Sequence, residues 1–214
     1  MSDDTHLLAE KQRILVALLP NVPFDGWTDT ALQQAARDAG LDAGLVARAF
    51  SGGAIEAVEF WIGATDRAMI EALEAEDLAV LKVRDRIALA ITLRLQAVEP
   101  HREAVRRALA LQALPQHAPG ALQSLYRTVD AIWHALGDKA TDFNFYTKRL
   151  LLAGVYSSTL LYWLNDKSEG QSATWAFLDQ RIDNVMQIQK LRGRFDKLAE
   201  KLPDPFNLLR RRGA

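Results

Sequence analysis

The 214-residue chain contains no cysteine, which excludes disulfides, thiolate metal ligands, cysteine nucleophiles and thiol redox switches. It also has few β-branched residues, with 11 Val and 9 Ile against 33 Ala and 32 Leu. Because Ala and Leu favour helices whereas Val and Ile favour strands, this bias predicts an all-helical fold. The composition is otherwise that of a folded soluble protein, with 49% hydrophobic and 25% charged residues.

Long apolar runs are also missing. The longest uncharged run, Leu150 to Asn165, has 16 residues, short of the roughly 20 that span a bilayer, and we expect it to form a buried helix. The first ten residues include Asp3, Asp4 and Glu10 but no basic residue, the wrong charge for a signal or transit peptide. We therefore expect the mature chain to start here.

The net charge of −1 is divided unevenly along the chain. Residues 1–50 carry four basic and seven acidic side chains, a net charge of −3, whereas residues 190–214 carry eight basic and three acidic, a net charge of +5. The acidic N-terminal part disfavours a nucleic-acid surface there, while an anionic surface would attract the basic C-terminal segment.

Helical periodicity, together with the positions of proline and glycine, predicts nine or ten helices joined by short loops. Three parts are expected: a three-helix unit at 1–52, a helical ligand-binding and dimerisation domain at 53–200, and a short basic tail at 201–214. The expected helices span 5–19, 29–39, 42–50, 54–74, 79–98, 101–114, 122–136, 141–164, 172–200 and 205–212.

The segment from Thr28 to Phe50 has the spacing of a helix-turn-helix and resembles the N-terminal unit of TetR-type regulators. A DNA-reading helix offers basic and amide side chains to phosphates and base edges. The second helix here has Arg48 as its only cation and Asp42 near its start, where a phosphate would otherwise be favoured. This pattern favours inherited architecture without DNA recognition.

The residues give no strong indication of catalysis or of a metal site. The four histidines, at positions 6, 101, 117 and 134, are scattered, and the paired Glu-x-x-His of helical di-iron proteins is absent. Asp130 and His134 lie one turn apart, a spacing more typical of a solvated polar stripe than of two metal ligands. The sequence also lacks a glycine elbow, a Ser-x-x-Lys arrangement and a glycine-rich phosphate loop.

The most specific stretch is VDAIWHALGDKATDFNFYTKRLLLAGVYSSTLLYW, Val129 to Trp163, followed by NDKS and TWAFLDQRIDNVMQ. Two further motifs precede it, LKVRDRI at Leu81 to Ile87 and RRALALQALP at Arg106 to Pro115. Together, in consistent order over about residues 5 to 190, they resemble the Coq-nine family, accessory proteins of ubiquinone (coenzyme Q) biosynthesis.

The resemblance implies a TetR-like all-α fold without DNA binding, usually dimeric, with an apolar pocket for lipid. It implies no catalysis by this chain and no cofactor, but a bound isoprenoid or phospholipid. It further implies a cytoplasmic protein, peripheral on the inner face of the cell membrane.

Family members present polyprenyl quinone intermediates to the demethoxyubiquinone hydroxylase, a membrane-associated di-iron enzyme. By resemblance, the contact patch carries over to Asp142, Asn144, Phe145, Tyr146 and Arg149. Phe145 stands where many relatives have Trp, which keeps an aromatic face but loses an indole donor. From the residues alone, aromatics among charges at this helix start are typical of an interface, and equally of a helix end whose aromatics turn inward.

Small residues in the middle of the helix at 141–164, facing apolar stripes on its neighbours, leave room for an elongated cavity. They also allow close helix packing with no cavity, which the residues favour without the family resemblance, and the sequence does not separate the two. The candidate lipid-contacting residues are Phe60, Trp61, Leu122, Val129, Ile132, Trp133, Gly154, Ser157 and Leu161.

The C-terminal tail combines apolar residues with a run of arginines, a pattern that favours membrane adhesion. The residues concerned are Phe206, Leu208, Leu209, Arg210, Arg211 and Arg212. The alternative is a solvated tail. For the whole chain, the alternatives to a lipid-binding accessory factor are a TetR-like regulator that binds a hydrophobic ligand and DNA, and an enzyme in its own right.

Overall fold

The computed structural model of the chain describes the backbone of residues 2–42, 44–138 and 143–199, and side chains from Thr5 to Gln187 outside 43 and 139–144. These residues form helices and turns without a strand, which confirms the predicted all-α class. The α-helices are α1 (Ser2–Leu18), α2 (Val22–Asp25), α3 (Asp29–Asp38), α4 (Leu45–Ala49), α5 (Ala54–Glu74), α6 (Val83–Ala97), α7 (Arg102–Gln112), α8 (Ala118–Ala135), α9 (Phe143–Trp163) and α10 (Ser172–Ala199).

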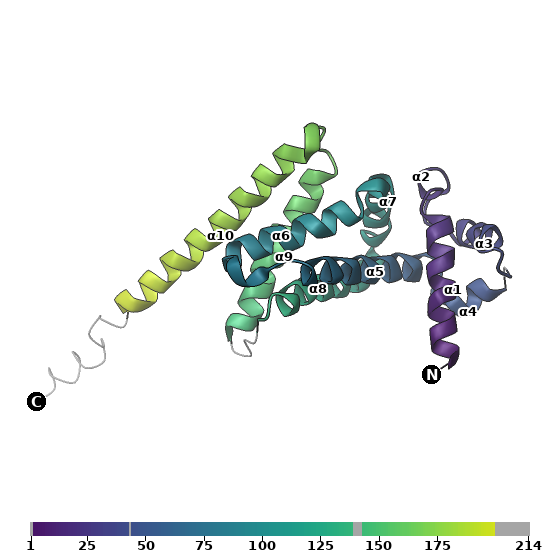
Figure 1. The fold of residues 1–214 in the computed structure, drawn as a ribbon, viewed down its shortest axis with the longest axis horizontal. Coiled ribbons are helices and arrows are strands. Elements are labelled where there is room, and N and C mark those ends of the chain that lie inside the picture. Colours follow the sequence, from purple (N-terminus) through teal and green to yellow (C-terminus); the bar gives the residue numbers. More distant parts are fainter. Residues whose placement is uncertain (1, 43, 139–142, 200–214) are drawn as a thin grey trace, which may run out of the picture.

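The first four helices form a small unit at one end of the molecule, drawn in purple and dark blue in Figure 1. Its core joins α1 to α3 through Ile14, Leu18 and Leu32, all buried. Thr28 begins α3 as its N-cap, since its hydroxyl accepts a hydrogen bond from the Ala31 amide at 3.1 Å. Helix α4 has only five residues, fewer than the predicted 42–50.

A glycine turn connects this unit to α5. Gly53 has φ +71°, and a Cβ there would lie 2.6 Å from Asp29 Oδ1. The same Asp29 oxygen accepts a hydrogen bond from the Ala54 amide at 2.9 Å. Only glycine therefore fits both the backbone conformation and the close approach of the Asp29 carboxylate.

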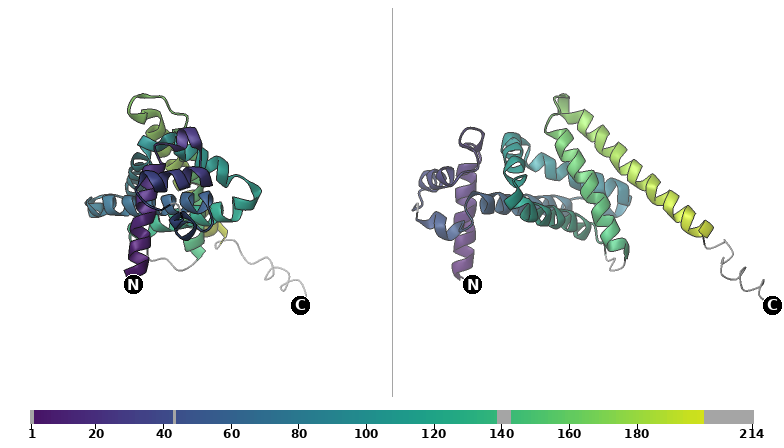
Figure 2. Two further views of the ribbon diagram at one scale, coloured as in Figure 1. Left: turned by 90° about the vertical axis from the view of Figure 1, so that its right-hand side faces the viewer. Right: turned by 180° about the vertical axis from the view of Figure 1, so that it is seen from behind.

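The helices α5, α8, α9, α10 and α6 pack in a ring. Each contacts the next in this order, and α6 contacts α5. Figures 1 and 2 show α9 and α10 side by side, with α10 extending well beyond the body formed by the other helices. The apolar stripes of these helices meet in a continuous core that includes Met69, Ile91, Ile132 and Trp163.

Helix α2 and the following Trp27 hold the N-terminal unit against α7. The Trp27 indole donates a hydrogen bond to the Ala104 carbonyl at 3.0 Å, and its ring lies 5.4 Å from that of Trp61. Arg107 adds a hydrogen bond to the Pro23 carbonyl at 2.7 Å. The single helical turn α2 was not predicted, because four residues carry no periodic signal and Pro23, its second residue, indicated a break.

Other helix boundaries agree with the predicted ones or differ at the ends. Helix α5 has the predicted bounds. Helix α8 begins at Ala118, four residues before the predicted start, because Pro119 is accommodated in the first turn, where no amide donor is needed. The predicted helix at 205–212 lies outside the described residues. In the part of the chain that the structure describes, no helix is long and apolar enough to cross a membrane.

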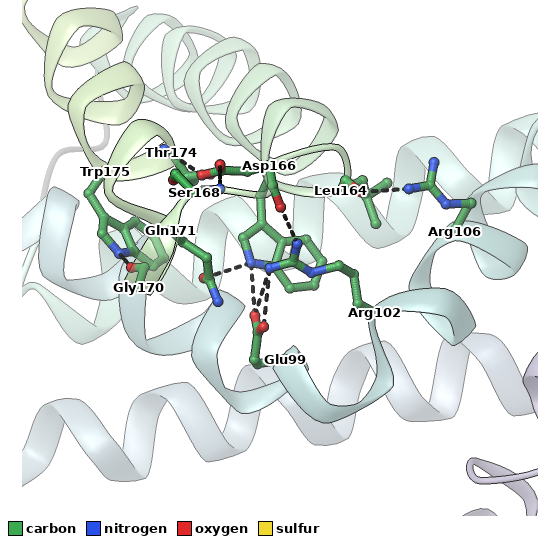
Figure 3. Close-up of polar contacts among 11 residues, drawn as sticks. Glu99, Arg102, Arg106, Leu164, Asp166, Ser168, Gly170, Gln171, Thr174 and Trp175 are labelled. Atoms are coloured by element: carbon green, nitrogen blue, oxygen red, sulfur yellow. Dashed lines mark hydrogen bonds and ion pairs between the residues drawn. The ribbon is translucent and has the colours of Figure 1, made fainter.

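The turn between α9 and α10 is held by a dense set of polar contacts, shown in Figure 3. The Asp166 carboxylate accepts hydrogen bonds from the Ser168 amide at 2.8 Å and from the Thr174 amide and hydroxyl at 2.8 and 2.6 Å. Arg102 and Arg106 donate to the carbonyls of Asp166 and Leu164, at 2.7 and 2.5 Å. These bonds satisfy the end of α9 and the start of α10 and fix the two helices together.

We predict that Asp166→Ala lowers the free energy of unfolding by about 1 kcal/mol, the usual cost of a lost cap. Hydrogen bonds from Thr174, and then from Ser168, hold the pKa of Asp166 well below its ordinary value. The contribution is therefore complete above the unfolded-state pKa of about 3.9 and declines as the pH falls below it.

Urea unfolding at pH 7 and pH 3 checks this prediction. The difference in free energy of unfolding between the native protein and Asp166→Ala should be smaller at pH 3 than at pH 7. The control is Asp179→Ala, which removes an exposed carboxylate 3.6 Å from Arg84. An equal difference at both pH values would contradict the proposed cap.

Candidate ligand cavity

A cavity of about 320 Å³ lies among α5, α6, α7, α8 and α9. Its volume is at the lower end of the range of about 300–1,000 Å³ found for small-molecule sites. The wall is mostly apolar, and its apolar lining residues are Trp61, Ile62, Val98, Val105, Ala108, Leu109, Ala113, Ala121, Leu122, Leu125, Leu160 and Leu161. The prediction left open whether these helices enclose a cavity or pack closely, and the structure has a cavity.

Two exposed leucines mark where the cavity meets the surface. Leu122 on α8 is 68% exposed and Leu161 on α9 is 57% exposed, and both line the cavity. Large apolar side chains at an opening suit a ligand with a hydrocarbon part, because such a ligand removes them from water.

The deep part of the cavity carries a buried ion pair. Arg94 on α6 donates to Asp66 Oδ1 on α5 at 2.7 Å, and both side chains are buried. The Thr128 hydroxyl on α8 donates to both Asp66 oxygens, at 3.1 and 3.0 Å. Arg94 also donates to the Tyr156 hydroxyl on α9. We call Asp66, Arg94, Thr128 and Tyr156 the polar floor.

The polar floor presents donors rather than a negative charge to the cavity. Arg94, Thr128 and Tyr156 line it, whereas Asp66 does not. Burial raises the pKa of the Tyr156 phenol, against the opposing effect of the Arg94 charge. Tyr156 is therefore neutral at physiological pH and keeps its O–H as a donor.

Four of the nine predicted lipid-contacting residues line this cavity: Trp61, Leu122, Ser157 and Leu161. The other five do not. Phe60 packs edge to face on Phe50 with ring centres 5.9 Å apart, and Gly154 is on an open face of α9. Val129, Ile132 and Trp133 are buried in the core instead. They continue the apolar stripe of Leu122 and Leu125, but they lie one to three turns farther along α8.

Sequence reasoning missed the polar floor, although a signal for it exists. Asp66 follows Val58 and Ile62 at helical spacing, and Arg94 follows Ile87 and Ile91 in the same way. A charged residue in the register of a buried stripe is informative, because unpaired charges are almost never buried. Two such residues of opposite sign on adjacent helices predict a buried ion pair.

The predicted partner patch lies at the start of α9. Asp142 and the side chain of Asn144 are outside the described residues. Tyr146 is 68% exposed, and its ring lies 5.2 Å from that of Phe145. Arg149 is buried, and its guanidinium bonds Asp130 at 2.7 Å and stacks on the Phe145 ring. Arg149 therefore ties α9 to α8, while Tyr146 is free to contact another molecule.

The remaining candidate residues are placed as follows. Asp130, considered with His134 as a metal-ligand pair, is engaged by Arg149. The described residues contain no group of three His, Asp or Glu side chains arranged to hold a metal ion. The six predicted membrane-contacting residues, at 206 and 208–212, lie outside the described part of the chain.

This arrangement of helices defines a class of protein. The TetR transcriptional regulator from Nitrosomonas europaea ATCC 19718 has a similar structure, with a TM-score of 0.67 over 81% of this chain and 95% of that chain, at 19% sequence identity. The chain therefore has a TetR-like fold, as predicted, and the likeness concerns the fold alone.

Sequence comparison identifies the family. The COQ9 family model matches residues 118–189. The chain is 34% identical over 203 residues, 93% of its length, to the ubiquinone biosynthesis protein COQ9, mitochondrial, of Drosophila melanogaster. It is 35% and 33% identical to the rat and human proteins of the same name, over 83% of its length. The chain belongs to the COQ9 family, and it spans 62%, 59% and 58% of the fly, rat and human proteins.

We predict that Arg94→Ala lowers the free energy of unfolding by about 3–5 kcal/mol, because it leaves the Asp66 charge buried and unpaired.

A triple variant makes the polar floor apolar by combining Asp66→Leu, Arg94→Met and Thr128→Val. It should be about as stable as the native protein, since no unpaired charge remains. We call it the apolar-floor variant. Chemical unfolding followed by circular dichroism checks both; an Arg94→Ala protein of native stability would contradict the buried pair.

Proposed function

We propose that this protein is a non-enzymatic accessory factor of ubiquinone biosynthesis. It binds a polyprenyl quinone intermediate and presents it to the demethoxyubiquinone hydroxylase, a di-iron enzyme, at the membrane. The observation that carries this proposal is the largely apolar cavity among α5–α9 in a chain of the COQ9 family. The names of the relatives give the pathway, and the cavity gives a physical means of taking part in it.

Burial of a prenyl chain supplies enough free energy for reversible binding. Each CH₂ group removed from water contributes about 0.8 kcal/mol. A few prenyl units against the leucines of the cavity therefore hold the lipid without any charged contact. The chain outside the cavity stays available to a bilayer, which suits transfer between a membrane and a second protein.

The start of α9 is the surface proposed to bind the hydroxylase. Tyr146 and Leu150 lie one turn apart and are both largely exposed. Tyrosine is common at the energetic centre of interfaces because it buries a large ring and still offers a hydroxyl. The ion pair between buried Arg149 and partly exposed Asp130 holds this turn of the helix in place.

Three further features complete the proposal. A homodimer is expected from the family, adhesion to the cytoplasmic membrane face is assigned to the basic tail, and no nucleic acid takes part. Helix α4 is short, and its one cation, Arg48, leaves little on it to contact a DNA groove.

We predict that the purified protein carries prenyl lipid or takes it up from vesicles that contain ubiquinone. Mass spectrometry of the lipid extract measures this directly. A protein that carries no prenyl lipid after purification and acquires none from vesicles would contradict lipid carriage. The control is a vesicle preparation without ubiquinone.

We predict that Tyr146→Ala weakens association with the hydroxylase about tenfold, while the helical content and the lipid content stay unchanged. The reason is that its exposed ring is lost from the centre of the contact without disturbing the core. Titration calorimetry measures association. Tyr126→Ala, an exposed tyrosine on α8, is the matched control. Loss of folding in Tyr146→Ala would show that this side chain is structural.

A further inference from the structure

Two buried polar side chains border the cavity without a protein partner. Gln112 on α7 is 8% exposed and Ser124 on α8 is 5% exposed, and both line the cavity. Neither side chain makes a hydrogen bond to any other residue that the structure describes. Their polar atoms are accessible from the cavity, so the partner that polar groups in a protein interior nearly always have must come from inside the cavity, either as water or as a ligand that replaces it.

The polar floor has spare donors as well. Arg94 has five N–H donors, and three of them are used, toward Asp66, Tyr156 and Thr128. The Tyr156 oxygen accepts from Arg94, and its own O–H has no acceptor among the described residues. Ser124 lies one helical turn before Thr128 on the same face of α8, so the free polar groups extend from the floor along one wall.

The charge of the floor restricts the chemistry of the ligand. The Arg94 charge is already balanced by Asp66 at 2.7 Å. A phosphate in the cavity would therefore be a second buried anion without its own counter-charge, which is strongly unfavourable. A neutral group with oxygen acceptors, such as a quinone, a phenol or a methoxy-substituted ring, meets the free donors without adding charge.

We propose that the cavity holds the neutral oxygenated ring of the ligand, with the ring inward and the hydrocarbon tail outward. Arg94 and Tyr156 donate to one ring oxygen, and Ser124 and Gln112 bind oxygen substituents along the wall. The tail leaves past Leu122 and Leu161. This inference rests on the proposed function, and it assigns the ligand as a prenylated ring rather than a phospholipid.

The size of the cavity supports this orientation. A volume of about 320 Å³ accommodates a substituted ring and the first part of a tail, but not a long polyprenyl chain. The apolar residues at the opening are placed where the tail would leave. A ring bound at the floor must be released before another protein acts on it.

The test compares two probes by equilibrium dialysis with mass-spectrometric detection. One is ubiquinone with two prenyl units, and the other is the ten-carbon hydrocarbon 2,6-dimethyl-2,6-octadiene, which has the same tail without a ring. We expect the apolar-floor variant to bind the quinone at least tenfold more weakly and the hydrocarbon within threefold of native. A ratio of the two affinities equal to that of the native protein would overturn the inference.

Tyr156→Phe gives a second, milder test that does not depend on folding of the triple variant. It removes one donor and frees another on Arg94, so the affinity ratio should change at least threefold in either direction. Tyr162→Phe is the control, because Tyr162 stacks on Phe177 outside the cavity. An unchanged ratio in Tyr156→Phe would overturn the inference.

The outcomes separate this inference from the proposed function. If both probes bind the native protein and the ratio is the same in every variant, lipid binding stands and the ring-inward assignment falls. If neither probe binds the native protein, both fall. Binding of dihexanoyl phosphatidic acid that weakens tenfold in the apolar-floor variant would overturn the assignment of a neutral ring.

Discussion

The buried ion pair between Arg94 and Asp66 joins four helices at one point. Asp66 comes from α5 and Arg94 from α6, and the pair is completed by Thr128 from α8 and Tyr156 from α9. Because a buried charge is tolerated only when its partners are in place, the four helices must approach in one arrangement. The walls of the cavity are parts of the same helices, so the pair also fixes the shape and the polarity of the cavity.

Helix α9 connects the cavity to the surface proposed for the hydroxylase. Tyr146 lies near its start and Tyr156 lies ten residues later, a rise of about 15 Å along the axis. Arg149 ties the first turns of α9 to α8, and the bonds around Asp166 fix the far end. A rigid helix held at both ends keeps the cavity and the proposed partner surface at a constant separation.

Much of the fold could be predicted from the sequence, because its signals are local. Gly53 and the apolar spacing after it define α5 to the residue, and Pro115 separates α7 from α8. The short α2 was missed because a single turn is too short to show a helical period. The first turn of α8 was missed because Pro119 was interpreted as a helix break, although proline is tolerated in the first turn.

The cavity was harder to predict, because it depends on how helix faces are turned toward each other. Helix α8 has one apolar stripe, of which the earlier residues Leu122 and Leu125 meet the cavity, while Val129 and Ile132, farther along the helix, fill the core. Small residues in α9 indicated space but not its location: Ser157 lines the cavity, whereas Gly154 faces outward. The pairing of Asp66 with Arg94 could have been predicted, because each residue continues the helical spacing of a buried apolar stripe.

A crystal structure of the protein with a short-tailed ubiquinone tests this account most directly. The account predicts the quinone ring in the cavity, with a ring oxygen within about 3.2 Å of donors of Arg94 or Tyr156 and the tail passing Leu122 and Leu161. An empty cavity with the quinone bound elsewhere, or a tail buried at the floor with the ring outside, would contradict it.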